Sequence, residues 1–168
     1  MATPKFDEYV DTYKALEKLY KDGRTKAIGV CNFDIEHLQR IIDECEIVPA
    51  VNQVERHPYL QQTELKNFCE KHGILLEAYS PLMNGAQVLD DPVIQEIANQ
   101  YDKTPAQVIL RWHLQTDVIV IPKTVTPSRM EENLNVFDFE LSNTDMDKIA
   151  NLDRGERDNS VPSEMNVR

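Results

Sequence analysis

The sequence has 168 residues, 41% of them apolar and 28% charged, which is ordinary for one globular domain with its own core. Its 29 acidic and 18 basic side chains give a formal net charge of -11, which argues against a broad nucleic-acid-binding surface, and no apolar run is long enough to span a membrane. The cysteines Cys31, Cys45 and Cys69 form no C-x-x-C pair, which argues against a disulfide framework or a zinc site. The first residues, "MATPKFDEYV", lack the apolar centre of a signal peptide, so we expect a reducing, cytoplasmic location.

The first half of the chain is predicted to alternate helices with short apolar strands. Apolar side chains at helical spacing predict a helix over Asp7–Lys21. The run "KAIGV" predicts a strand, and Asp34 can cap the helix that follows it. We then expect a strand at "PAVNQVE", a helix over Leu60–Lys71, and a strand at "ILLEAYSPL" that continues into a loop.

The second half continues the alternation. Pro92–Tyr101 is predicted to be helical, and Thr104 is predicted to cap a helix that begins with proline and ends near residue 115. "DVIVIPK" predicts the last strand. Two further helices are expected over Pro127–Asn135 and Ser142–Asn151, the second with a capping box formed by Ser142 and Asp145. The tail over residues 154–168 is polar and is expected to be irregular.

This order of elements predicts an α/β fold with a parallel sheet covered by helices, in a single domain spanning residues 1–168. About four strands are too few for a closed (β/α)₈ barrel, which takes roughly 250 residues.

Polar side chains recur where these strands end, which is where parallel α/β proteins bind their ligands. Lys123 follows the last apolar run, and Arg129 lies just past the Thr-Pro start of the next helix. A basic pair placed at a strand end and a helix start predicts an anion site. The other strand-end residues are Cys31, Asn32, Gln53, Tyr79, Ser80 and Thr124.

The stretches "KAIGVCNF", "PAVNQVERHPY", "LLEAYSPL" and "VIVIPKTVTPSRMEENLNVFDFEL" closely resemble the aldo-keto reductase family, in the family's order and approximate spacing. The match runs over essentially the whole chain but covers only the second half of the family's barrel. The resemblance therefore implies the C-terminal half of a TIM-type (β/α)₈ barrel.

The resemblance also implies a bound nicotinamide cofactor, NADP(H). Asn32 and Gln53 would bond the nicotinamide carboxamide, and Tyr79 would stack on the ring. The other implied contacts are Ser80 and Leu82 at the pyrophosphate, Lys123, Thr124 and Arg129 at the 2'-phosphate, and Glu132 and Asn133 at the adenine.

Two positions depart from the family pattern. Cys31 stands where serine is usual, and a thiol is a weaker donor. Arg56 stands at the edge of the expected substrate mouth, where it would either favour acidic substrates or be a solvated arginine.

The family's catalytic aspartate, tyrosine, lysine and histidine match no residue here. We therefore expect no catalytic residue and no metal site in this chain, and none of the histidines His37, His57, His72 and His113 is expected to replace the missing one. The parent activity is NADPH-dependent reduction of aldehydes and ketones, and this chain alone is expected to be inactive, whether it is a fragment, a truncated product or a deliberate half-barrel.

Two alternatives remain: a non-catalytic nucleotide-binding or structural half-barrel that self-associates, and an unrelated (β/α) phosphate-binding protein. Expected partners are a small carbonyl substrate and either further copies of the chain or a separate N-terminal half, with no nucleic acid and no membrane.

Overall fold

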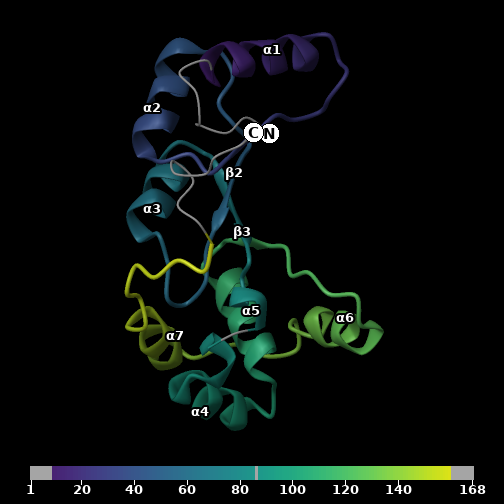
Figure 1. Cartoon of the computed structure of the whole chain (residues 1–168), viewed down its shortest axis with the longest axis vertical. Helices are drawn as coiled ribbons and strands as arrows, with labels where there is room; N and C mark the ends of the chain where they lie inside the picture. The colour runs from purple at the N-terminus through teal and green to yellow at the C-terminus, as the bar shows by residue number, and fades with distance from the viewer. Residues whose placement is uncertain (1–8, 86, 160–168) are drawn as a thin grey trace. The chain divides into compact units, whose positions relative to one another are not determined.

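The computed structural model describes residues 9–85 and 87–159 (Figure 1). These residues form an α/β fold whose parallel sheet has the strand order β1-β2-β3-β4, which confirms the predicted fold class. β1 pairs with β2 in parallel, with Val30 opposite Asn52 and Cys31 opposite Gln53. The strands are β1 (Val30–Cys31), β2 (Val51–Glu55), β3 (Leu75–Tyr79) and β4 (Ile119–Val120). The helices are α1 (Tyr9–Lys21), α2 (Ile35–Glu44), α3 (Thr63–Lys71), α4 (Pro92–Tyr101), α5 (Pro105–Gln115), α6 (Pro127–Leu134) and α7 (Asn143–Ala150), with short 3₁₀ turns at Met83–Gly85 and Gln87–Asp90.

The chain divides into two compact units. The first unit comprises residues 1–54, 62–77 and 159–168, and the second comprises residues 55–61 and 78–158. Each unit has its own buried residues and is described by itself below.

In the first unit, the buried face of α1 packs on the segment after β1. Tyr9 meets Phe33 edge to face at 5.2 Å between ring centroids, and Leu38 and Ile41 of α2 are fully buried. Gly29 lets β1 and β2 approach closely, because a Cβ there would lie 2.8 Å from the backbone oxygen of Val51. Any side chain at position 29 would therefore push the two strands apart.

In the second unit, the core lies between α4, α5 and α7, and it contains no residue of α6. Trp112 of α5 is almost completely buried and packs with Ile94, Ile97 and Ile149. Figure 1 shows α6 apart from α4 and α7, with α5 between them in this view. Helix α6 is therefore positioned by something other than this core.

The structure corrects four details of the predicted elements. Helix α3 begins at Thr63 rather than at residue 60, because Gln62 has a left-handed backbone with φ of 51° that cannot belong to the helix. The last strand is only Ile119–Val120, since Pro122 has no N–H for a ladder. Asp34 stands at the N-cap of α2 but accepts no hydrogen bond there.

The fourth correction concerns the capping box of α7. The hydroxyl of Ser142 accepts from the N–H of Asp145 at 3.2 Å, as expected for a cap. The N–H of Ser142, however, donates to the hydroxyl of Tyr101 at 2.9 Å instead of to the Asp145 carboxylate. Only half of the predicted box is formed, because Tyr101 supplies the other acceptor.

Candidate functional site

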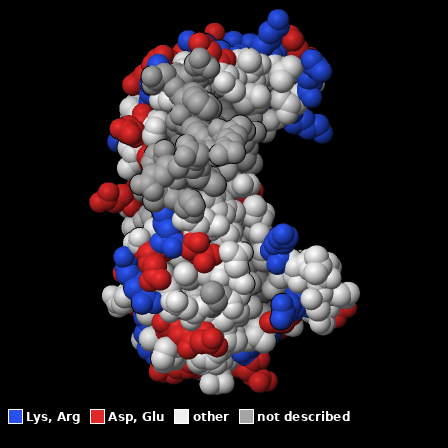
Figure 2. All heavy atoms as spheres, in the orientation of Figure 1, with Lys and Arg blue, Asp and Glu red and all other residues white. Residues whose placement is uncertain are grey.

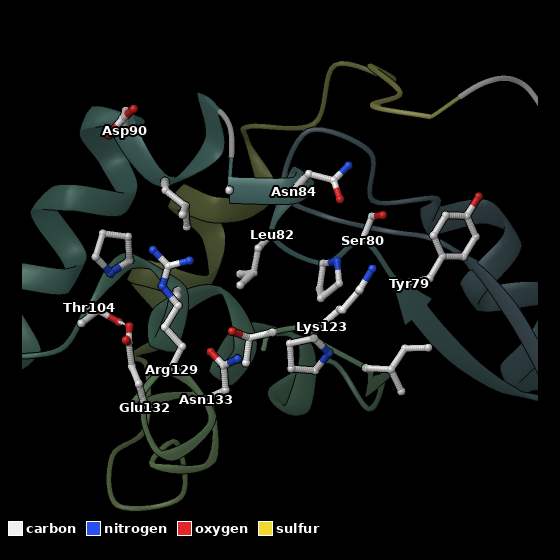
Figure 3. Close-up of a pocket in the computed structure, with 18 of the residues that line it drawn as sticks. Tyr79, Ser80, Leu82, Asn84, Asp90, Thr104, Lys123, Arg129, Glu132 and Asn133 are labelled. Atoms are coloured by element: carbon white, nitrogen blue, oxygen red, sulfur yellow. Dashed lines mark hydrogen bonds between the residues drawn. The ribbon is translucent and has the colours of Figure 1, made fainter. Parts of the chain in front are cut away.

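The second unit contains a pocket of about 820 Å³, within the size range of small-molecule sites (Figure 3). Its walls are the loop after β3, the N-terminal end of α5, and the segment from the end of β4 into α6. Eight of the ten predicted cofactor residues line it: Tyr79, Ser80, Leu82, Lys123, Thr124, Arg129, Glu132 and Asn133.

The loop after β3 forms a wall with an unusual backbone. Ser80, Met83 and Asn84 all have left-handed conformations, with φ of 48°, 46° and 53°. Met83 is buried in the core of the unit, and the amide of Asn84 donates to Asp158 at 2.6 Å. Strained backbone that is fixed from both sides is common at ligand sites, because it holds a wall in one shape.

Lys123 and Arg129 extend into the pocket from the segment after β4 and from α6, toward the loop that carries Ser80 and Leu82 (Figure 3). Neither forms an ion pair or a side-chain hydrogen bond with any described residue. The other Lys and Arg residues of the second unit all have such a partner: Arg56, Lys103, Arg111, Lys148, Arg154 and Arg157.

The surface of the second unit carries both signs of charge. On the face shown in Figure 2, acidic side chains gather toward α4, both signs lie together over α7, and basic side chains lie beside α6 with acidic ones nearby. The pocket lining holds equal formal charges, Lys123 and Arg129 against Asp90 and Glu132, but the two cations have no partner among the described residues and are available to an anion.

In the wall opposite the loop after β3, a side-chain hydrogen bond links the start of α5 to α6. The hydroxyl of Thr104, at the N-cap of α5, donates to Oε1 of Glu132 at 2.6 Å. Thr104, Asn84 and Asp90 line the pocket but were not predicted as site residues. Thr104 was predicted only as a helix cap, and the sequence does not show that this cap faces α6.

The remaining two predicted residues, Asn32 and Gln53, belong to the first unit. The N–H of Asn32 donates to the carbonyl of Gln53 at 2.8 Å, and Asn32 turns the chain with φ of 60°. The side-chain amide of Gln53 donates to Glu77, and its oxygen lies 3.8 Å from the thiol of Cys31. Burial raises the pKa of the Cys31 thiol, so it stays protonated and can donate to Gln53.

The model of the aldo/keto reductase family matches residues 1–154. The chain belongs to this family. It is 53% identical over 162 residues to a glyoxal reductase of Bacillus subtilis (strain 168), covering 96% of this chain and 58% of that relative.

Solved structures agree in fold. A variant of Gox0644 in complex with NADPH is 49% identical, with a TM-score of 0.90 over 95% of this chain and 59% of that one. The aldo-keto reductase MGS-M4, from a Medee basin deep-sea metagenome library, has a TM-score of 0.93 at 39% identity, over 96% of this chain and 60% of that one. This aldo-keto reductase chain thus spans somewhat more than half the length of the relatives it matches.

Within residues 9–85 and 87–159, no helix has the length and apolar character needed to cross a bilayer, and no three His, Cys, Asp or Glu side chains are placed to hold a metal ion.

Arg56 is neither a solvated arginine nor part of an exposed mouth, which corrects the sequence-based expectation. It is 2% exposed, its guanidinium lies 4.0 Å from the centre of the Trp112 ring, and its Nε donates to the carbonyl of Gln61 at 3.0 Å. Burial lowers the pKa of Arg56 to about 9. A side chain held in this way cannot select acidic substrates in this aldo-keto reductase chain.

Proposed function

We propose that the pocket of the second unit binds the 2'-phosphate and adenosine end of NADP(H), and that the chain is the cofactor-binding part of an NADPH-dependent reductase of small aldehydes and ketones. The observation that carries this proposal is the pair of unpaired cations, Lys123 and Arg129, in one pocket of an acidic chain. A guanidinium and an ammonium suit a phosphate dianion, whose charge-assisted hydrogen bonds are strong.

The remaining residues that line the pocket take the roles that the family resemblance implies. Thr124 adds a hydroxyl to the phosphate contacts, and Asn133 offers an amide to the adenine. The carboxylate of Glu132 has two oxygens, one of which is engaged by Thr104, so the other serves the adenine. Ser80 and Leu82 flank the pyrophosphate.

The nicotinamide ring is assigned to Tyr79 of the second unit, which stacks on it. Asn32 and Gln53, the carboxamide contacts that the resemblance implies, belong to the first unit. When bound, NADPH supplies the hydride for carbonyl reduction. The relatives named glyoxal reductase and methylglyoxal reductase support a small carbonyl compound as the substrate of the whole protein.

We further propose that these 168 residues do not turn over substrate by themselves. Reduction of a carbonyl needs a general acid placed at its oxygen, which typically contributes about 10² to 10⁴-fold. The tyrosine that has this role in the aldo-keto reductase family matches no position in this sequence. Three free cysteines also support a reducing, cytoplasmic compartment.

The phosphate assignment is tested by Arg129→Ala and Lys123→Ala, with binding of NADPH and NADH measured by cofactor fluorescence. We expect each variant to weaken NADPH roughly tenfold or more and NADH much less, because a charge-assisted bond contributes about 1.5–3 kcal/mol. Lys148→Ala is the control, since Lys148 is paired with Glu96 and does not line the pocket. Equal losses for both cofactors would mean that these cations do not recognise the 2'-phosphate.

A second candidate, self-association without chemistry, is favoured by exposed apolar side chains around α6. Val125, Leu134 and Phe137 are 86%, 71% and 72% exposed in the described chain. Apolar surface of this kind marks an interaction site. The two candidates are compatible, because a cofactor-binding unit can also pair with further copies or with a separate N-terminal half.

A further inference from the structure

Helix α6 brings Arg129, Glu132 and Asn133 into the pocket, yet none of its eight residues is buried. A helix of about two turns is not stable by itself and normally depends on packing an apolar face against a core. Polar contacts with a neighbouring element must therefore set where its pocket side chains lie.

Gln107 of α5 makes these contacts. Its Nε2 donates to the carbonyl oxygen of Glu132 at 3.1 Å and to that of Asn135 at 2.9 Å, at the C-terminal end of α6. Its Oε1 accepts from the backbone N–H of Thr104 at 3.0 Å. Both N–H donors of the side-chain amide are thus used on α6. Gln107 is buried, so water does not readily replace these bonds.

Thr104 closes the same network. Its hydroxyl accepts from the N–H of Gln107 at 3.2 Å and donates to Oε1 of Glu132 at 2.6 Å. The capping box of α5 and the end of α6 therefore form one hydrogen-bonded group. Arg129 lies three residues before Glu132 on the helix held by this group.

We propose that Gln107 is a positioning residue that sets the preference for NADP(H) over NAD(H), because it holds α6 where Arg129 meets the 2'-phosphate. Gln107 does not line the pocket and acts only through α6. The inference rests on the proposed function, since it requires that the pocket binds a 2'-phosphorylated nucleotide.

Two substitutions separate the roles of Gln107. Gln107→Glu keeps an acceptor for the capping box, which glutamate serves as well as glutamine, but it sets a carboxylate against two carbonyl oxygens. Gln107→Met removes the contacts to both helices without adding charge. Circular dichroism checks that each variant is folded. If the Met variant is not, a Glu variant that keeps the wild-type preference still refutes the proposal.

The measurement is the Kd of the full chain for adenosine 2',5'-bisphosphate and for 5'-AMP, by titration calorimetry. We expect both variants to lower the preference for the bisphosphate over 5'-AMP roughly fivefold or more, because α6 carries the adenine contacts, which both ligands use, and the Arg129 contact, which only the bisphosphate uses. In an Arg129→Ala background, Gln107→Met should change the ratio of the two constants no further.

The outcomes distinguish this inference from the function on which it depends. A wild-type chain with no preference for the bisphosphate would refute the proposed function. A wild-type preference that survives in both Gln107 variants would refute the positioning role alone. Loss of preference only in the Glu variant would also refute the positioning role, since added charge would then explain the effect. A further loss of preference on adding Gln107→Met to the Arg129→Ala background would refute it as well.

Discussion

At the scale of single residues, the interior of the second unit holds a histidine that stays neutral. His113 is fully buried, and its two ring nitrogens lie 2.9 Å and 3.1 Å from the carbonyl oxygens of Ile109 and Arg56. Burial, followed by the nearby Arg56 guanidinium, lowers the pKa of His113 to about 3 despite these two acceptors. The unfolded chain therefore binds a proton at this position far more readily than the folded chain.

This difference predicts an acid-dependent loss of stability. The pKa of His113 is lower in the folded chain than in the unfolded chain. Its contribution to the free energy of unfolding is therefore complete above the unfolded pKa of about 6.5 and is lost as pH falls toward the folded pKa. Between pH 7.5 and pH 5 the loss is about 2 kcal/mol in the free energy of unfolding. Urea unfolding at pH 7.5 and pH 5 measures it. His113→Gln should be less stable at pH 7.5 but should lose clearly less on acidification. Equal acid losses in wild type and His113→Gln would contradict the account.

Arg56 gives a second residue-scale prediction. Its Nη1 is buried and has no hydrogen-bond partner among the described residues, so the guanidinium lacks full compensation for its desolvation. Arg56→Met should keep the stem's packing on Trp112 and should leave the free energy of unfolding within about 1 kcal/mol of wild type, or raise it. Arg56→Ala should cost about 2–5 kcal/mol, because it leaves a cavity. A loss in the Met variant as large as in the Ala variant would show that the charge itself is stabilising.

At the scale of the elements, the sequence predicted the features that depend on residues close together in the chain, such as the starts of helices. Helices α4 and α5 begin at Pro92 and Pro105, as expected, because each proline follows a residue whose side chain caps the helix. The burial of Arg56 was not predictable, since its partner Trp112 is remote in sequence. The contacts that hold α6 beside the pocket were not predictable for the same reason. The spacing of Thr104 and Gln107 fits a capping box, but the contacts of Gln107 with residues 25 and 28 positions later leave no pattern in the sequence.

The two ends of α4 should respond in opposite directions to substitution. Asp91 accepts from the N–H of Val93 at 2.9 Å and from the hydroxyl of Tyr59 at 2.7 Å, so Asp91→Ala should cost about 1–2 kcal/mol. Asp102 follows the helix with a left-handed φ of 51°, so Asp102→Gly should raise stability by up to about 1 kcal/mol. Thermal unfolding of the two variants checks both signs, and a destabilised Asp102→Gly would show that the aspartate side chain has a role of its own.

At the scale of the whole molecule, β1 and β4 stand at the two ends of the strand order, so each is an edge of the sheet. Edge strands and exposed apolar side chains both promote association. We predict that the chain sediments as a dimer or larger species at micromolar concentration. Leu134→Lys combined with Phe137→Lys should shift it toward monomer, whereas Val48→Lys in the first unit should not. A stable, cooperatively unfolding monomer of the wild type would contradict this prediction.

The main proposal is that the pocket around Lys123 and Arg129 recognises a ribose 2'-phosphate. Its most direct test is calorimetric titration of the wild-type chain with adenosine 2',5'-bisphosphate and 5'-AMP, at low and at moderate salt. We predict that the bisphosphate binds at least roughly tenfold more tightly than 5'-AMP, with an advantage that shrinks as salt rises, because both cations are exposed. Equal affinity for the two nucleotides, or no binding of either, would contradict it.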